Sequence, residues 1–78
     1  MDDLEKTGKL YTVSGVFYTA NHGQYKFKLG EIVLYLKRNP CAYNNYDKFD
    51  YYFLISNGNI VISYFCDQNY IETFSSPT

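Results

Sequence analysis

The chain has few of the residues on which many protein activities depend. It contains no tryptophan, a single histidine (His22) and two cysteines (Cys41 and Cys66) among 78 residues. A zinc site needs three or four closely spaced ligands, and the two cysteines lie far apart in the sequence. We therefore expect no metal and no cofactor. The thiols are expected to be reduced and structural, with a disulfide bridge between them as the alternative.

Charge of either sign is also scarce. The chain has seven Lys and Arg residues and eight Asp and Glu residues, which gives a formal net charge of -1. Binding that depends mainly on phosphate contacts requires clustered Lys and Arg, so the composition disfavours a nucleic-acid partner. The length is far below the roughly 150 residues or more that TIM barrels and dinucleotide-binding folds need, and it predicts a single small domain.

No hydrophobic run is long enough to cross a bilayer. The longest uncharged apolar stretch, residues 51–66, is interrupted by the polar residues 56–59. The acidic, polar N-terminus is unlike a secretory signal, and a cytoplasmic protein without a membrane partner is expected. Frequent Asn, Tyr, Lys and Ile with little Ala or Arg is typical of A/T-rich genes, such as those of many phages.

β-Branched and aromatic residues dominate what the chain does contain, and no helical periodicity is present. Five segments have strand character, and they are residues 10–18, 25–29, 32–36, 51–55 and 60–65. A single 3₁₀ turn at 66–70 and a short strand at 71–74 follow. Residues 19–24 and 41–50 are expected to be loops. In the first of them, Asn21 and Gly23 can adopt positive φ at little cost, and His22 is expected to be exposed. We predict an all-β, partly open barrel of five to six antiparallel strands in residues 10–74, after a lead-in at 1–9 and before a tail at 75–78.

Two local features give this prediction more detail. The segment Ser56-Asn57-Gly58-Asn59 between two β-rich runs predicts a hairpin whose tight turn has positive φ at both central residues. Residues 32–36 are apolar on both faces, which indicates a central strand. The expected interior consists mainly of aliphatic residues and phenylalanines: Val13, Phe27, Ile32, Leu34, Leu36, Phe53, Ile55, Val61 and Ile71.

Three segments resemble the Src-homology-3 domain. Phe27-Lys28-Leu29-Gly30-Glu31 is similar to the stretch that enters the second strand of that family, and Tyr51-Tyr52 stands where the family usually has two tryptophans. Residues 65–72 resemble the family's 3₁₀ turn and last strand. The chain lacks the acidic loop residues and the groove proline of the family. The resemblance implies a small barrel with Tyr18, Tyr51 and Tyr70 near a groove for an extended partner segment.

Tyrosine is the one residue in marked excess, with 10 Tyr and 6 Phe giving 21% aromatic residues. An aliphatic interior leaves several tyrosines for the surface, where tyrosine is enriched at protein interfaces. We therefore predict a non-catalytic protein-binding or peptide-binding module, such as a phage or mobile-element protein that modulates a host protein. The candidate binding residues are Tyr18, Tyr43, Tyr46, Tyr51 and Tyr70. Tyr64 is also expected at the surface, and the competing interpretation is that these rings only cover the ends of the barrel.

Other classes of function have less support. Catalysis would need a Cys-His pair or two carboxylates in one pocket, and three of the eight carboxylates lie in the lead-in, so no enzyme is expected. The alternative function is single-stranded nucleic-acid binding, with aromatic stacking beside Lys26, Lys28, Lys37, Arg38 and Lys48. Self-association through the edges of an open barrel is a third option.

Overall fold

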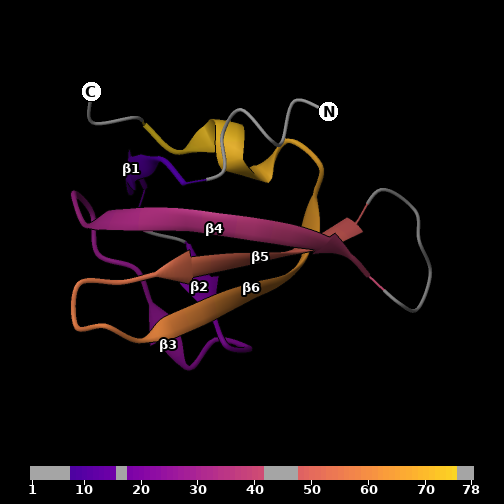
Figure 1. Cartoon of the computed structure of the whole chain (residues 1–78), viewed down its shortest axis with the longest axis horizontal. Coiled ribbons are helices and arrows are strands. Elements are labelled where there is room, and N and C mark those ends of the chain that lie inside the picture. Colours follow the sequence, from indigo (N-terminus) through magenta and orange to yellow (C-terminus); the bar gives the residue numbers. More distant parts are fainter. Residues whose placement is uncertain (1–7, 16–17, 42–47, 76–78) are drawn as a thin grey trace.

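The computed structural model describes residues 8–15, 18–41 and 48–75. These residues form two antiparallel sheets and one short 3₁₀ helix (Figure 1). The elements are β1 (Leu10–Thr12), β2 (Thr19–Ala20), β3 (Tyr25–Lys26), β4 (Ile32–Pro40), β5 (Lys48–Leu54), β6 (Ile60–Asp67) and the 3₁₀ helix η1 (Tyr70–Thr73). One sheet has the order β1-β4-β5-β6, and β2 pairs with β3. The predicted all-β class with six antiparallel strands is confirmed, and the sheets do not close into a barrel.

Strand β4 lies between β1 and β5, as its two apolar faces predicted. The face that enters the core, however, is that of Val33 and Tyr35, which are fully buried. Ile32 is 50% exposed, so its predicted interior position is wrong, and Leu34 and Leu36 are only partly buried. Alternation in a strand places residues two apart on one face, but it does not say which of two apolar faces is covered.

The hairpin between β5 and β6 is confirmed, but its turn type differs from the prediction. Gly58 has φ of 90°, whereas Asn57 does not have positive φ. The Gly58 N–H donates to the Ile55 carbonyl at 2.9 Å, and the Ile55 N–H donates to the Asn59 carbonyl at 3.0 Å. This is a three-residue loop in which a glycine in the left-handed region follows an ordinary turn, a geometry that also suits strand twist.

The chain after β6 is arranged differently from the prediction. Strand β6 extends to Asp67, opposite Lys48, so the predicted 3₁₀ turn at 66–70 and the strand at 71–74 are both displaced. The 3₁₀ helix itself covers Tyr70–Thr73 and places Ile71 and Phe74 in the core. An isolated bridge between Thr12 and Ser75 then joins the two ends of the domain.

Several predicted strands and loops are shorter than expected. Strand β1 covers three residues of the predicted 10–18, and β3 covers two residues of the predicted 25–29. The 19–24 loop contains β2 and a turn in which Asn21 and Gly23 have positive φ, as expected. Residues 48–50 of the predicted 41–50 loop belong to β5. Gly8, placed in the lead-in by the sequence, donates its N–H to the Tyr35 carbonyl at 2.7 Å.

The core contains buried tyrosines in addition to the predicted aliphatic residues and phenylalanines. Six predicted interior residues are buried, and they are Val13, Phe27, Phe53, Ile55, Val61 and Ile71. Tyr35, Tyr51 and Phe53 are completely buried, and their rings contact one another with centroids 5.8 to 6.5 Å apart. Phe27 and Phe74 pack edge-on and face-on against this group. Cys41 and Cys66 are both free thiols. No helix within the described ranges is long and apolar enough to cross a membrane.

Candidate binding site

The structure separates the predicted binding tyrosines into three groups. Tyr43 and Tyr46 lie outside the described residues. Tyr51 has 0% exposure, so its expected surface position is wrong. Its hydroxyl lies 2.9 Å from the Asp67 carbonyl and 3.0 Å from that of Gln68, and such partners allow a tyrosine to be buried. Tyr18 and Tyr70 remain partly exposed, and they lie side by side.

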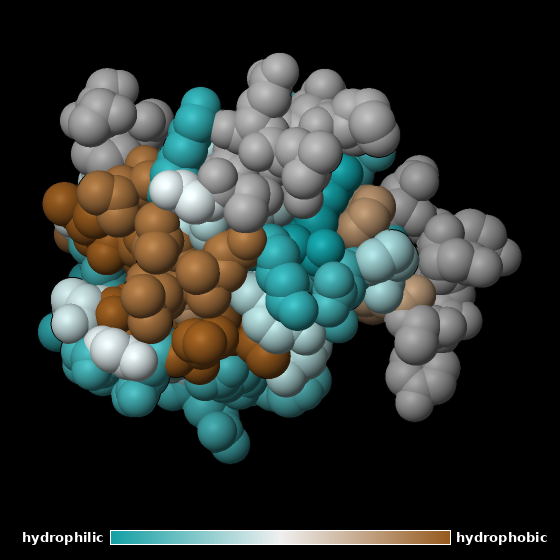
Figure 2. Space-filling view, in the orientation of Figure 1, coloured by the Kyte–Doolittle hydropathy of each residue, from teal (hydrophilic) through white to brown (hydrophobic). Residues whose placement is uncertain are grey.

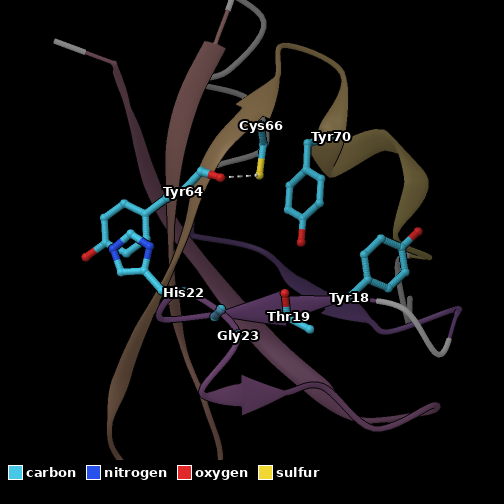
Figure 3. Close-up of a pocket in the computed structure, with 8 residues that line it drawn as sticks. Tyr18, Thr19, His22, Gly23, Tyr64, Cys66 and Tyr70 are labelled. Carbon is cyan, nitrogen blue, oxygen red and sulfur yellow. Dashed lines mark hydrogen bonds between the residues drawn. The ribbon is translucent and has the colours of Figure 1, made fainter. Parts of the chain in front are cut away.

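Tyr18 and Tyr70 line a pocket of about 220 Å³ between β2, β6 and η1 (Figure 3). The other residues that line it are Thr19, Ala20, His22, Gly23, Tyr64 and Cys66. Figure 3 shows Tyr18 and Tyr70 on one side, with the paired rings of His22 and Tyr64 on the other. The pocket therefore has aromatic walls on two sides, and none of the described residues that line it is Lys, Arg, Asp or Glu.

The Tyr18–Tyr70 wall is fixed by the core beneath it. The two rings meet edge to face with centroids 5.8 Å apart, and the Tyr70 ring also contacts Tyr51 at 5.0 Å. The Tyr70 hydroxyl donates to Ser63 Oγ at 3.2 Å, and Ser63 Oγ donates to the Thr19 carbonyl at 3.0 Å. Burial raises the pKa of Tyr70 above its ordinary value, so the hydroxyl stays neutral. This wall is a rigid, uncharged surface.

The His22–Tyr64 wall depends on a clamped turn. Asn21 and His22 have φ of 54° and 57°, in the left-handed region that Asn tolerates better than most residues. The Asn21 N–H donates to the Ile62 carbonyl at 2.7 Å, and Asn21 Oδ1 accepts the Ile62 N–H at 3.1 Å. These two bonds hold the turn against β6, where the His22 ring stacks on Tyr64 with centroids 4.2 Å apart and planes 5° apart.

A β-bulge in β6 directs Tyr64 and Cys66. Phe49 pairs with Cys66 and Tyr51 pairs with Ser63, so Tyr64 and Phe65 together face Asp50. Phe65 has φ of 61°, and its N–H donates to Asp50 Oδ1 at 3.1 Å. The Cys41 thiol donates to the same carboxylate oxygen at 3.2 Å. The Asp50 carboxylate therefore stabilises the bulge that forms one side of the pocket.

The thiol in the pocket is not prepared for nucleophilic chemistry. Burial, followed by the nearby Asp50 carboxylate, raises the pKa of Cys66 to about 12. The Cys66 sulfur lies 3.5 Å from the Tyr64 carbonyl and 3.6 Å from that of Ser63. Among the described residues, no group of three or more His, Cys, Asp or Glu could hold a metal ion. The arrangement can contact a ligand, but it lacks a prepared nucleophile.

The cations proposed for nucleic-acid binding are spread over the surface. The Arg38 guanidinium stacks over Phe49 at 4.1 Å and donates to the Gln68 carbonyl at 2.8 Å. Lys48 forms an ion pair with Asp67, and Lys37 lies over the Tyr52 ring at 4.8 Å. None of these residues, nor Lys26 or Lys28, lines the aromatic pocket.

His22 and Thr19 line the pocket, but no sequence pattern assigned them to a binding site. His22 is an exposed turn residue between Asn21 and Gly23, both at positive φ, as the sequence predicts, whereas its stacking on Tyr64 was not predicted. Those turn residues were the available signal, because a tight turn brings the residue between them close to a neighbouring strand. Comparison of the chain with models of protein families, with curated proteins and with solved structures found no match.

Proposed function

We propose that this protein is a non-catalytic binding module that holds a segment of a protein or peptide in the aromatic pocket. The observation that carries the proposal is the juxtaposition of two aromatic pairs, Tyr18 with Tyr70 and His22 with Tyr64, around one opening. Rigid aromatic rings supply large contact area with few torsions to immobilise, which is why they are frequent in protein-binding surfaces.

The size of the pocket supports a peptide rather than a small metabolite. At about 220 Å³ it is smaller than the roughly 300–1,000 Å³ of sites that enclose a drug-sized molecule. It suits one uncharged side chain of a larger ligand, whose remaining contacts lie on the surrounding surface. The resemblance to the Src-homology-3 family implies Tyr18, Tyr51 and Tyr70 near a groove for an extended segment, and two of these three, Tyr18 and Tyr70, line the pocket.

Nucleic-acid binding has weaker support from the same geometry. The aromatic walls could stack on bases, but single-strand binding also requires a basic groove along the backbone. Within residues 8–15, 18–41 and 48–75, no Lys or Arg lines the pocket, and the cations near Phe49 and Asp67 already have partners. We therefore propose a protein or peptide as the ligand.

The test is selection of binders from a library of random displayed peptides, followed by affinity measurements on variants. Tyr64→Ala and His22→Asn remove the exposed wall, and asparagine tolerates the positive φ of residue 22. Loss of a central aromatic contact is worth about 1.4 kcal/mol or more, so we expect binding at least about tenfold weaker.

Tyr52→Ala is the matched control, because it removes a partly buried tyrosine that does not line the pocket. Its affinity for the selected peptides should equal that of the wild type. If every selected peptide binds the Tyr64 and His22 variants as tightly as the wild type, the pocket is not the binding site. Tyr51 is unsuitable for this experiment because its substitution would disturb the core.

A further inference from the structure

The outer face of the four-stranded sheet is aliphatic although it is not part of the core. Strand alternation and register place six aliphatic side chains on this outer face: Leu10, Ile32, Leu34, Leu54, Ile60 and Ile62. Leu10, Leu34, Leu54 and Ile60 are direct cross-strand neighbours, so one row of aliphatic residues crosses all four strands. Figure 2 shows the corresponding continuous apolar area over the sheet. Residues at both ends of the row are about half exposed, with 48% for Leu10 and 56% for Ile60.

Such a face is unusual for an antiparallel sheet that has its core on the other side. Val33, Tyr35, Phe53 and Val61 fill the inner face, and an outer face in water is normally polar. Contiguous exposed apolar patches commonly mark an interaction surface. The 3₁₀ helix η1 does not cover this face, because its Ile71 points into the core.

The six aliphatic positions of the face carry no charge themselves. Lys37 lies beside them, with its ammonium 4.8 Å from the centre of the Tyr52 ring, and alternation along β5 places Asp50 on the same side, beyond Tyr52. The whole chain has a net charge of -1, so two copies would repel each other only weakly. Neither the face nor the chain as a whole opposes self-association.

We propose that the outer face is the interface of a homodimer, in which the sheets of two copies stack face to face. Interfaces between identical subunits are more apolar than other protein interfaces. The Leu10–Leu34–Leu54–Ile60 row is uncharged, and a second copy presents the same surface, as an isologous contact requires. Stacked sheets pack in this way in β-sandwiches.

The size of the face sets the expected strength of the dimer. Strands about 4.8 Å apart and outward residues about 6.7 Å apart along each strand give a projected area of about 260 Å² for two outward residues on each of four strands. Protruding side chains have a larger accessible area than their projection, and two copies would bury between about 500 and 1,000 Å² in total. That area is typical of weak, transient interfaces, and we expect a dissociation constant in the high micromolar range.

Sedimentation velocity over a concentration series tests the proposal with the full chain. We expect the wild type to convert from monomer to dimer in the high micromolar range. The double variant Ile32→Glu with Ile60→Glu changes two exposed positions and should weaken dimerisation at least tenfold. Gln24→Glu controls for the added charge, and Phe65→Asn controls for the loss of an exposed apolar residue away from this face. Both controls should dimerise like the wild type.

Mixing two variants with opposite charges at the same positions tests whether this face binds the same face of a second copy. The Ile32→Glu, Ile60→Glu chain and an Ile32→Lys, Ile60→Lys chain should each be monomeric, and their mixture should form a heterodimer. A wild type that stays monomeric at millimolar concentration would overturn the proposal, as would dimerisation that the double variant leaves unchanged or a mixture that stays monomeric. If the variants do not fold, isotope-filtered NMR of mixed labelled and unlabelled wild-type protein gives a second test. Methyl contacts between copies must then include Leu34 and Leu54, and the absence of these contacts would equally overturn the proposal.

Discussion

Tyr51 illustrates how this protein accommodates so many tyrosines. Its ring lies in the core against Tyr35 and Phe53, while its hydroxyl reaches two backbone carbonyls and accepts a bond from Arg38 at 3.2 Å. A buried hydroxyl without partners would destabilise the fold by about 1–3 kcal/mol. With partners, the same side chain adds apolar area to the core and a fixed polar contact to the end of β6.

Cys66 carries a prediction about alkaline stability. Burial raises the pKa of its thiol from 9.0 to about 12, so the folded state keeps a proton that the unfolded state releases. This contribution to stability is fully present below pH 9 and is lost as the pH rises toward 12. Urea denaturation at a series of pH values should show the wild-type free energy of unfolding falling from pH 9 upward, and falling less steeply for Cys66→Ser.

The comparison between Cys66→Ser and the wild type isolates the thiol. Cys41, whose pKa burial also raises, and Tyr25, whose pKa burial and Glu31 raise to about 12, contribute equally to both proteins. Parallel pH profiles for the wild type and the variant would show that the folded and unfolded states ionise Cys66 alike.

At the scale of elements, the bulge in β6 is the least regular part of the sheet. It holds Phe65 at positive φ, a conformation that a residue with a Cβ adopts at a penalty of about 1–2 kcal/mol. The Phe65 side chain is 52% exposed and contacts the Lys48 ammonium only at 5.8 Å from the ring centre. The bulge therefore stores strain that the side chain does not offset by burial.

Phe65→Gly should accordingly raise the free energy of unfolding by about 1 kcal/mol, because glycine adopts positive φ without the Cβ contact. The Asp50 bond to the residue 65 N–H is a backbone contact and is retained. Thermal and urea denaturation measure the effect. Gly58→Ala, at φ of 90° in the hairpin loop, is the reverse control and should lower stability by about the same amount. A less stable Phe65→Gly protein would mean that the ring contacts outweigh the backbone strain.

The elements also show which local signals were sufficient. The β5–β6 hairpin and the positive φ at Asn21 and Gly23 follow from short-range turn chemistry, and they were predicted correctly. The covered face of β4 was predicted wrongly, because both faces are apolar and the choice depends on pairing with Phe53. The His22–Tyr64 wall joins residues 42 positions apart in sequence (64 − 22), and no local pattern contains that contact.

At the scale of the whole molecule, Phe74 anchors the C-terminal segment in the core. It lies after the last regular element, yet it is 6% exposed and its ring contacts Tyr18, Phe27, Phe53 and Tyr70. The adjacent Ser75 bridges back to Thr12 in β1. The C-terminal segment therefore supports the core and the Tyr18–Tyr70 wall together.

Phe74→Ala should destabilise the protein by about 3–5 kcal/mol, the usual effect of removing a buried aromatic ring. Small domains have only about 5–15 kcal/mol of stability, so we expect a large fall in the urea midpoint or an unfolded chain. Leu29→Ala, at the most exposed apolar side chain of the described residues, is the control and should change stability by less than about 0.5 kcal/mol. A change in the free energy of unfolding for Phe74→Ala as small as that for Leu29→Ala would show that Phe74 does not stabilise the core in this way.

The all-β class, the strand alternation and the β5–β6 hairpin follow from the amino-acid sequence, because they depend on residue preference and on contacts between near neighbours. Which tyrosines are buried, which face of β4 is covered and which rings surround the pocket depend instead on long-range packing. A tyrosine is stable in the core when its hydroxyl forms a hydrogen bond within the protein, and it is stable at the surface when its hydroxyl is in water. The hydrogen bonds from the Tyr51 hydroxyl to the Asp67 and Gln68 carbonyls, and the stacking of Tyr64 on His22, depend on how segments far apart in the sequence pack together.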